Sequence, residues 1–371
     1  MVIKRLNLVN FRNYSKVNLE LGPSMNIFIG ENASGKTNIL ESIVVLALTK
    51  SYKNINESNL IRLAQKKTKI KGTVKNNKSL KNLEIEIIET GKIVKVNNKR
   101  VYCLADYISN LNIVLFTPDD LELIKGSPSI RRNLLNMELS QLSSLYLNTY
   151  NQYNKILRTR NEYLKILFTN NIADKKYLDI LTEQLIDKAI VIYKLRNEYL
   201  ERINKNINSI FKNITDEEKL SILYKPNISF SNYENDILKK TMREIFDKNC
   251  QRELHIGMTL FGPHRDDFQF QLNDVDMKLF SSQGQQKSAV LAYKLSTIPI
   301  FEEKNGTKPV LLLDDIFSEL DLKKKNRLLK YVNQDIQSII TTTDLKNISK
   351  KSLENATIFK VSNGNVERSN N

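Results

Sequence analysis

Apolar and polar positions alternate along the first thirty residues, a pattern typical of β-strands. The segments IKRLNLVNF (3–11) and KVNLEL (16–21) follow a period of two and are separated by the polar turn RNYS. A short apolar run, MNIFIG (25–30), ends at a glycine, and from residue 38 the pattern NILESIVVLAL changes to helical spacing. Strand-like segments with turn signals between them return over residues 66–116.

The middle of the chain, from residue 130 to about 214, has a different pattern. Apolar side chains recur there at helical spacing over two long stretches, which we expect to form antiparallel arms. Gly and Pro are absent from residue 129 through residue 225, so neither residue interrupts these helices. The apolar runs PVLLLDD (309–315) and SIITTT (338–343) then restore the α/β pattern.

The sequence thus predicts an α/β fold with mixed sheets that is interrupted by a helical second lobe. We expect the helical lobe to separate two parts of one α/β lobe. The predicted boundaries are residues 1–126 for the N-terminal part of lobe I, 127–254 for helical lobe II, and 255–371 for the C-terminal part of lobe I.

The composition is that of a globular protein with a large excess of basic residues. Lys and Arg number 57 against 41 Asp and Glu, giving a net charge of +16, which suggests a polyanionic partner. With 15 Arg among the 57, most of the excess is Lys, which also fits AT-rich codon usage. Two Cys and two His exclude a disulfide framework and a Cys/His zinc cluster. No apolar stretch reaches the ~20 residues of a membrane span, so we expect a cytoplasmic protein without a membrane partner.

One segment matches the phosphate-loop pattern G-x-x-x-x-G-K-[ST] in full. An apolar strand precedes it and a helix follows, which is the context this motif requires. Its backbone N–H groups and the helix N-terminus would bind the phosphates of ATP. Lys36 would bridge the β- and γ-phosphates, and the Thr37 hydroxyl would ligate Mg²⁺. The phosphate loop consists of Gly30, Glu31, Asn32, Ala33, Ser34, Gly35, Lys36 and Thr37.

Two adjacent carboxylates, Asp314 and Asp315, follow the apolar run VLLL. A fully buried strand does not carry acids in its middle, but its carboxyl end opens on the crevice where α/β folds bind ligands. We expect Asp314 to hold Mg²⁺ through water. We expect Asp315 to act in hydrolysis by polarising the attacking water, with Lys36 as the second catalytic residue, at the phosphates.

A third segment, Ser282-Gln283-Gly284-Gln285, opens a predicted helix about thirty residues before Asp314. Alone, small polar residues at this position are typical of a helix cap. Between the phosphate loop and the acidic pair, they resemble the signature motif of ABC-type ATPases, with Ser282, Gly284 and Gln285 in the matching places. That resemblance implies contact in trans with the γ-phosphate bound to a second subunit, so that ATP joins two chains.

Taken together, these motifs resemble the RecF family of bacterial recombination mediators over essentially the whole chain. The resemblance implies a P-loop, ABC-type ATPase head related to SMC proteins, without their long coiled coil. It implies an ATP-dependent homodimer that binds single-stranded DNA or duplex next to gaps. It also implies that, with RecO and RecR, the protein helps load RecA during repair and the SOS response. The segments that carry it are LNLVNFRNY (6–14), GENASGKTNILESI (30–43), FTPDDLELIKGSPSIRRNLLN (116–136), GPHRDDFQF (262–270), SSQGQQKS (281–288) and LLLDDIFSELD (311–321).

The chain departs from ABC transporters at two positions. The segment SIITTTD offers Thr341 to Thr343 where transporters have a switch histidine, which leaves the γ-phosphate sensor open. Asp315 stands where many ABC heads have Glu, and a shorter carboxylate reaches less far toward water. We therefore expect a weak ATPase that uses ATP hydrolysis as a slow switch.

Candidate DNA contacts lie on one predicted strand, where lysines alternate with other residues and so share a face. This lysine stripe would bind phosphates without reading bases. A solvated sheet face in a Lys-rich chain explains the pattern equally well. Arg12 is a further candidate for a cation near the nucleotide phosphates. The lysine stripe consists of Lys67, Lys69, Lys71 and Lys75.

Two other functions remain open at this stage. The chain could be the ATPase subunit of a transporter, although residues 117–125 lack the Gln expected of its loop and transport does not explain the two arms. It could also be a nucleotide-sensing protein that binds only protein partners. DNA affinity in different nucleotide states separates these functions from an ATP-dependent role in recombinational repair and replication-gap processing.

Overall fold

The computed structural model describes residues 1–369 apart from 54, 77–78, 170–174, 216–218, 320, 333–334, 346–352 and 354–355. The chain forms two compact units. Unit 1 comprises Met1–Leu121, Ile207–Glu218 and Lys287–Asn371, and unit 2 comprises Glu122–Asn206 and Lys219–Gln286. The lobes expected from the sequence differ from these units in three segments: residues 122–126 and 255–286 fall in unit 2, and residues 207–218 fall in unit 1.

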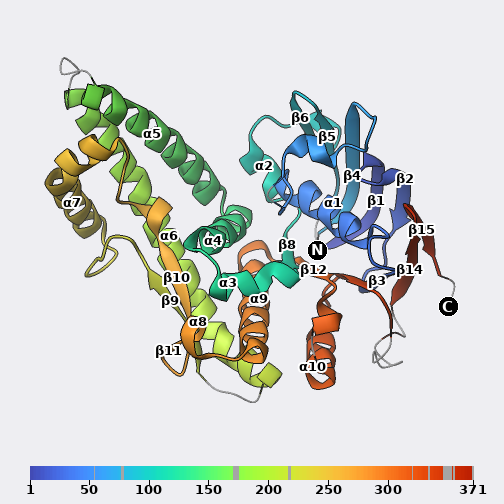
Figure 1. Ribbon diagram of the computed structural model, residues 1–371. Helices are drawn as coiled ribbons and strands as arrows, with labels where there is room; N and C mark the ends of the chain where they lie inside the picture. The colour runs from blue at the N-terminus through green and yellow to red at the C-terminus, as the bar shows by residue number, and fades with distance from the viewer. Residues whose placement is uncertain are drawn as a thin grey trace. The chain divides into compact units, whose positions relative to one another are not determined.

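Unit 1 contains an antiparallel sheet in the order β2-β1-β4-β5-β6-β7 (Figure 1). Successive side chains of a strand point to opposite faces, so β4 buries Thr68, Ile70 and Val74 and presents its lysines on the other face. The strands are β1 (Val2–Phe11), β2 (Tyr14–Glu20), β4 (Lys67–Lys75), β5 (Leu80–Ile88), β6 (Gly91–Val96) and β7 (Lys99–Arg100).

The second sheet of unit 1 has the order β15-β14-β3-β13-β12-β8 and is parallel except at its β14–β15 edge. Strand β13 lies between β3 and β12, with Thr341 opposite both Phe28 and Asp314. The carboxyl ends of β3, β13 and β12 therefore meet at one edge of the sheet. The strands are β3 (Met25–Ile29), β8 (Ile113–Phe116), β12 (Val310–Asp314), β13 (Ser338–Thr342), β14 (Thr357–Ser362) and β15 (Asn365–Arg368).

Helix α1 (Lys36–Leu48) is buried almost throughout and packs between the two sheets of unit 1. Its pattern IVVLAL is apolar on all sides, as expected for a helix surrounded by protein. No helix within the described ranges is long and apolar enough to cross a membrane. The other α-helices that the structure describes in this unit are α2 (Leu104–Ile108), α10 (Leu322–Val332), the last residues of α6 (Lys175–Thr215) and most of α9 (Gln283–Asn305), and the remaining residues of α6 and α9 belong to unit 2.

Unit 2 is built on long helices and a small antiparallel sheet in the order β11-β10-β9. Helices α5 and α6 run antiparallel, because residues later in α5 contact residues earlier in α6. Three contacts mark this register: Tyr146 with Arg196, Arg160 with Thr182, and Tyr163 with Tyr177. The elements are α3 (Glu122–Lys125), α4 (Pro128–Leu142), α5 (Ser144–Thr169), α6 (Lys175–Thr215), β9 (Leu220–Lys225), α7 (Asn235–Ile256), β10 (Asp267–Leu272), β11 (Val275–Asp276) and α8 (Met277–Phe280).

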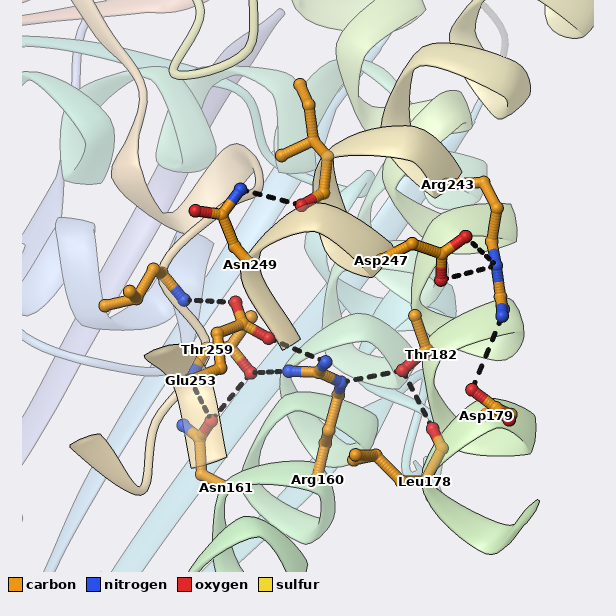
Figure 2. A network of polar contacts seen from close by, with 12 residues as sticks. Arg160, Asn161, Leu178, Asp179, Thr182, Arg243, Asp247, Asn249, Glu253 and Thr259 are labelled. Carbon is orange, nitrogen blue, oxygen red and sulfur yellow. Dashed lines mark hydrogen bonds and ion pairs between the residues drawn. The ribbon is translucent and has the colours of Figure 1, made fainter. Parts of the chain in front are cut away.

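A buried polar network joins α5, α6 and α7 (Figure 2). The Arg160 guanidinium donates to Glu253 Oε2 at 2.7 Å, and both side chains are at most 2% exposed. It also donates to Thr182 Oγ1 at 3.0 Å and to Thr259 Oγ1 at 2.8 Å. Because a buried charge is costly unless it is paired and hydrogen-bonded, this satisfied cluster fixes the three helices and the turn that follows α7.

A second buried cluster holds the segment before β10. Arg196 on α6 donates to Asp266 Oδ2 at 2.8 Å and to the Pro263 carbonyl at 2.6 Å. Asp266 also accepts the Tyr224 hydroxyl, and Arg131 donates to both carboxylate oxygens of Asp267. These contacts explain why residues 263–267 belong with the helices of unit 2.

Candidate nucleotide-binding site

The phosphate loop connects β3 to α1, as the sequence predicts. Gly35, the residue before α1, has a φ of +113°, which side-chain-bearing residues rarely adopt. A Cβ there would lie 2.6 Å from Asn13 Nδ2 and 2.7 Å from the Tyr14 hydroxyl. Tyr14 donates to the Gly35 carbonyl at 2.9 Å. Both the conformation and the close approach therefore require glycine at this position.

The Lys36 side chain folds back over the phosphate loop. Its Nζ donates to the carbonyls of Gly30 at 2.7 Å and Glu31 at 2.8 Å. Burial lowers the pKa of Lys36 below its usual value, and the charges of Asp315 and Asp314 act in the opposite direction. The ammonium group is thus held at the loop, where it can attract an anionic ligand.

The acidic pair comes close to the phosphate loop, although it is distant in the sequence. Thr37 Oγ1 donates to Asp314 Oδ1 at 2.9 Å. Asp314 is 5% exposed and is the last residue of β12, which is separated from β3 by β13. Asp315 follows with a φ of +48°, and its N–H donates to the Thr341 hydroxyl at 3.0 Å. The predicted metal ligands, Thr37 and Asp314, are therefore direct neighbours.

A hollow of about 160 Å³, partly open to solvent, lies between the phosphate loop and the acidic pair. Ser34 Oγ is buried without a hydrogen-bond partner among the described residues, but Ser34 is not one of the residues that line the hollow. The hollow is lined by Asn32, Ala33, Gly35, Lys36, Thr37, Asn38, Asp314 and Asp315.

The neighbouring oxygens of Thr37 and Asp314 fit a magnesium site. Octahedral Mg²⁺ with ligands at ~2.1 Å places adjacent oxygens about 3 Å apart, close to the 2.9 Å between these two atoms. Among the described residues, no three His, Cys, Asp or Glu side chains form a group able to hold a metal ion. An ion here would therefore need the Thr37 hydroxyl, Asp314 and further oxygens from a nucleotide or water.

Two further side chains were not predicted from the sequence: Tyr52, which contacts the acidic pair, and the buried acid Glu41. The Tyr52 hydroxyl lies 3.5 Å from Asp314 Oδ2, and burial, with the charge of Asp314, raises the pKa of Tyr52. Its phenol therefore stays a proton donor. Glu41 is fully buried on α1 and accepts Ser51 Oγ at 2.6 Å. Neither residue type nor spacing distinguishes them in the sequence, because loop packing brings them into place.

Arg12 contacts Glu41 in this structure rather than the phosphate loop. Its Nε and one terminal nitrogen donate to the two Glu41 carboxylate oxygens at 2.9 and 2.8 Å, and its other nitrogen donates to the Asn59 carbonyl. Such a bidentate pair is among the stronger side-chain contacts. A role for Arg12 on nucleotide phosphates stays a prediction.

The residues that resemble the ABC signature motif lie at the start of α9, in unit 2. The Ser282 N–H donates to Gln285 Oε1 at 2.9 Å, and the Gln285 N–H donates to Ser282 Oγ at 3.2 Å. This reciprocal capping box stabilises the beginning of the helix. Ser282 and Gly284 are exposed. Their contact with the nucleotide of a second chain stays a prediction.

The lysine stripe lies on the exposed face of β4, but three of its members are in cross-strand ion pairs with β5. This pairing follows from the sheet register, in which Lys71 is opposite Glu84 and Lys69 is opposite Glu86. The alternation LEIEIIE already places these acids on one face, but only the register shows which lysines they meet. The pairs are Lys67–Glu86 at 3.0 Å, Lys69–Glu84 at 3.4 Å, Lys69–Glu86 at 3.5 Å and Lys71–Glu84 at 2.9 Å.

Glu84 is the centre of these pairs. Partial burial by itself would raise its pKa, but hydrogen bonds from Lys71 and Lys95 and the charges of Lys69 and Lys71 outweigh this effect and lower the pKa of Glu84 to about 2. The lysines on this face are thus partly neutralised. A DNA phosphate would have to compete with Glu84 and Glu86.

Comparisons with known proteins cover the whole chain. Residues 2–367 match the family described as "RecF/RecN/SMC N terminal domain". A protein of Listeria monocytogenes serotype 4b named "DNA replication and repair protein RecF" is 40% identical over 370 residues, covering 100% of both chains. A protein of the same name from Staphylococcus epidermidis is 39% identical, covering 99% of this chain and 100% of that one.

Solved structures agree with these sequence matches. One described as the "recombination mediator protein RecF-ATP in RecFOR pathway" superposes with a TM-score of 0.91 at 32% identity, covering 99% of this chain and 97% of that chain. An Smc head bound to the C-terminal winged-helix domain of ScpA has a TM-score of 0.57 at 16% identity, covering 100% of this chain and 97% of that chain. The second likeness concerns the fold alone. The α/β fold with an ABC-type ATPase head and a helical lobe, predicted from the sequence, is thereby confirmed.

Proposed function

This chain belongs to the RecF family of DNA replication and repair proteins, and we propose that it is an ATP-dependent DNA-binding protein of recombinational repair and replication-gap processing. The observation that carries the proposal is the contact between Thr37 of the phosphate loop and Asp314 at 2.9 Å, beside a hollow that also contains Lys36. Similarity over the full length to RecF proteins supports the proposal and argues against a transporter subunit.

The proposed ligand of this hollow is ATP with Mg²⁺, and a related RecF has been solved with ATP. The phosphate-loop N–H groups and the ammonium of Lys36 would bind the phosphates. Thr37 and Asp314 would hold Mg²⁺, directly or through water, and the ion would supply charge neutralisation at the phosphates.

Asp315 is the proposed group that polarises the attacking water. Its backbone is held in the left-handed region, which sets the direction of its short side chain. A carboxylate of this length reaches less far than Glu, so we expect weak hydrolysis. ATP hydrolysis would then act as a slow switch between binding states.

ATP is proposed to join two copies of this chain. Ser282, Gly284 and Gln285 would contact the γ-phosphate of the second copy, as in other ABC-type heads. The exposure of Ser282 and Gly284 at the N-terminus of α9 supports this role, because a helix N-terminus attracts anions.

The proposed DNA contacts are the lysine stripe on β4. The lysines of the stripe, Lys67, Lys69, Lys71 and Lys75, point to the same face of the sheet. Phosphates would displace Glu84 and Glu86 as partners, and such contacts carry little sequence information. The charge of +16 supports largely electrostatic affinity that falls with salt.

Further partners are proposed from the relatives. A related protein is described as a member of the RecFOR pathway, and we propose that this chain acts with RecO and RecR to help load RecA, including in the SOS response after DNA damage. A role on the chromosome implies a cytoplasmic location.

DNA binding in different nucleotide states tests this function. The affinity for duplex, gapped and single-stranded DNA is measured with ATP, with ADP and without nucleotide across a salt series, with Lys36→Arg as the control. Tighter binding with ATP, lost in Lys36→Arg, is expected. The proposal is contradicted if the protein binds no DNA in any nucleotide state. Salt-dependent DNA binding that is the same with and without ATP contradicts only the role of ATP as a switch.

A further inference from the structure

Thr341 contacts both members of the acidic pair. It lies on β13, between the strand that ends in the phosphate loop and the strand that ends in Asp314, and it is fully buried. Its hydroxyl donates to Asp314 Oδ1 at 2.7 Å and accepts the N–H of Asp315 at 3.0 Å. The Thr341 hydroxyl is thus a hydrogen-bond donor to the Asp314 carboxylate and a hydrogen-bond acceptor from the backbone of Asp315.

The contact with Asp314 fixes the oxygen that faces the phosphate loop. Asp314 Oδ1 accepts Thr37 from α1 and Thr341 from β13. The Thr341 hydroxyl therefore sets the position of this oxygen from the strand side, independently of Thr37. The Tyr52 hydroxyl lies near the other oxygen at 3.5 Å, so both carboxylate oxygens have a nearby hydroxyl group from outside the phosphate loop.

The contact with Asp315 supports an uncommon backbone conformation. Asp315 has a φ of +48°, a region that few residues other than Gly, Asn and Asp adopt. Its N–H is shared between the hydroxyl and the carbonyl of Thr341, at 3.0 and 3.2 Å. Thr341 therefore contributes both of these hydrogen bonds to the turn that precedes the Asp315 side chain.

The neighbouring threonine does not share this position. Successive side chains of a strand alternate between faces, and the Thr342 hydroxyl donates to the Asp344 carbonyl instead. Among Thr341 to Thr343, which were considered as γ-phosphate sensors, Thr341 is the residue whose hydroxyl hydrogen-bonds to Asp314 and Asp315.

We infer that Thr341 is a positioning residue, which orients Asp314 toward the magnesium ion and Asp315 toward the attacking water. The inference rests on the proposed function, because it assigns a part in binding Mg-ATP. It needs no contact between Thr341 and the nucleotide. Thr341 acts by holding two acids in one arrangement, so the loss of its hydroxyl affects ion binding and hydrolysis more than the binding of nucleotide without metal.

Three variants test this inference in the full-length chain. Thr341→Val removes the hydroxyl and keeps the β-branched shape, whereas Thr341→Ser keeps the hydroxyl. Thr68→Val is the matched control, because Thr68 is also a buried threonine on a strand of unit 1. The substitution removes the hydrogen bond that the Thr68 hydroxyl donates to the Val9 carbonyl. Melting temperatures of all variants report folding.

The main readout is the Mg²⁺ concentration that half-saturates the binding of a fluorescent ATP analogue, and the second is single-turnover hydrolysis. Thr341→Val should raise that concentration and slow hydrolysis about 10- to 100-fold, as is typical when a partner of a metal ligand is removed. Thr341→Ser should restore both to within about threefold of wild type, in line with its retained hydroxyl. Thr68→Val should change the melting temperature only.

Two results would overturn the inference alone: wild-type Mg²⁺ dependence in Thr341→Val, or equal loss in Thr68→Val. A wild-type protein that binds the analogue equally well with and without Mg²⁺ has a different meaning. That result contradicts the proposed binding of Mg²⁺ with ATP, and the inference about Thr341, which depends on that binding, is then contradicted too.

Discussion

Thr37 Oγ1 lies 2.9 Å from Asp314 Oδ1, although 277 positions separate the two residues in the chain. The contact joins the first residues of α1 to the end of β12, and the helical residues of unit 2 lie between them in the sequence. The nucleotide site therefore forms only when both halves of unit 1 fold onto one sheet. Four predictions concern this site, the lysine stripe and the buried groups of unit 2.

Replacement of Asp315 by Asn should slow hydrolysis without loss of nucleotide binding. The amide cannot accept a proton from water, and removal of a general base typically costs about 10²- to 10⁴-fold in rate. The affinity for a fluorescent ATP analogue, measured by titration, should stay within about threefold, because Lys36 and the phosphate loop are intact. Equal hydrolysis rates in single-turnover assays of wild type and variant would remove Asp315 from the mechanism.

Neutralising the acids beside the lysine stripe should strengthen DNA binding. In Glu84→Gln/Glu86→Gln, the lysines lose their intramolecular partners and become available to phosphates. The plot of log affinity against log salt should steepen by about one to two units, one for each additional phosphate contact. Fluorescence anisotropy with a duplex measures both quantities.

Glu89→Gln provides the control, because it makes half the charge change at an exposed position in the turn after β5. If its effect on affinity is half that of the double variant, general charge explains the result and the lysine stripe has no special role.

The stability of unit 2 should fall between pH 6.5 and 4 because of His264. Burial lowers the pKa of His264 to about 4, so in this range the unfolded chain binds a proton that the folded chain does not. Protonation then favours unfolding, and at pH 4.5 the loss is about 2 kcal/mol. Urea unfolding at pH 7 and pH 4.5 should show this loss in wild type and not in His264→Gln. The same pH dependence in both proteins would rule out His264 as its source.

Breaking the buried pair in Figure 2 should destabilise unit 2 strongly. Arg160→Ala leaves Glu253 buried without its cation, which typically costs about 3–5 kcal/mol. Arg160→Met/Glu253→Leu removes both charges and should recover most of that loss. Denaturant unfolding measures each value.

The matched variant is Arg243→Ala, whose ion pairs with Asp179, Glu183 and Asp247 are partly exposed. Its cost should stay below about 1 kcal/mol. Similar losses in Arg160→Ala and Arg243→Ala would contradict the importance of burial.

Local patterns in the sequence predicted the phosphate loop and the acidic pair, because each is a short motif at a strand end. Gly35 could be predicted for the same reason, since the motif requires a left-handed residue there. The nearness of Asp314 to Thr37 followed from the rule that parallel strands open at one edge. These parts of the site depend on few long-range contacts.

Residues whose roles depend on register could not be assigned in this way. From the sequence, Lys69 and Lys71 were candidates for contacts with DNA phosphates. The pairing of β4 with β5 places Glu84 and Glu86 beside them. Arg12 contacts Glu41 because the turn after β1 packs against α1, which no spacing indicates. The sequence indicated Thr341 to Thr343 as a group. Only the structure shows that the Thr341 side chain points to the face of β13 where Asp314 lies.

The most direct test of the central claim, that ATP bound at Thr37 and Asp314 controls DNA binding by two copies of the chain, is the mass of the protein–DNA complex. Sedimentation of a fluorescent gapped duplex is followed with wild type, Lys36→Arg and Ser282→Arg, in ATP and in ADP. The account predicts two chains per DNA for wild type with ATP, and loss of that complex with ADP and in both variants. The same complex in ATP and ADP, or its survival in Lys36→Arg, would contradict the account.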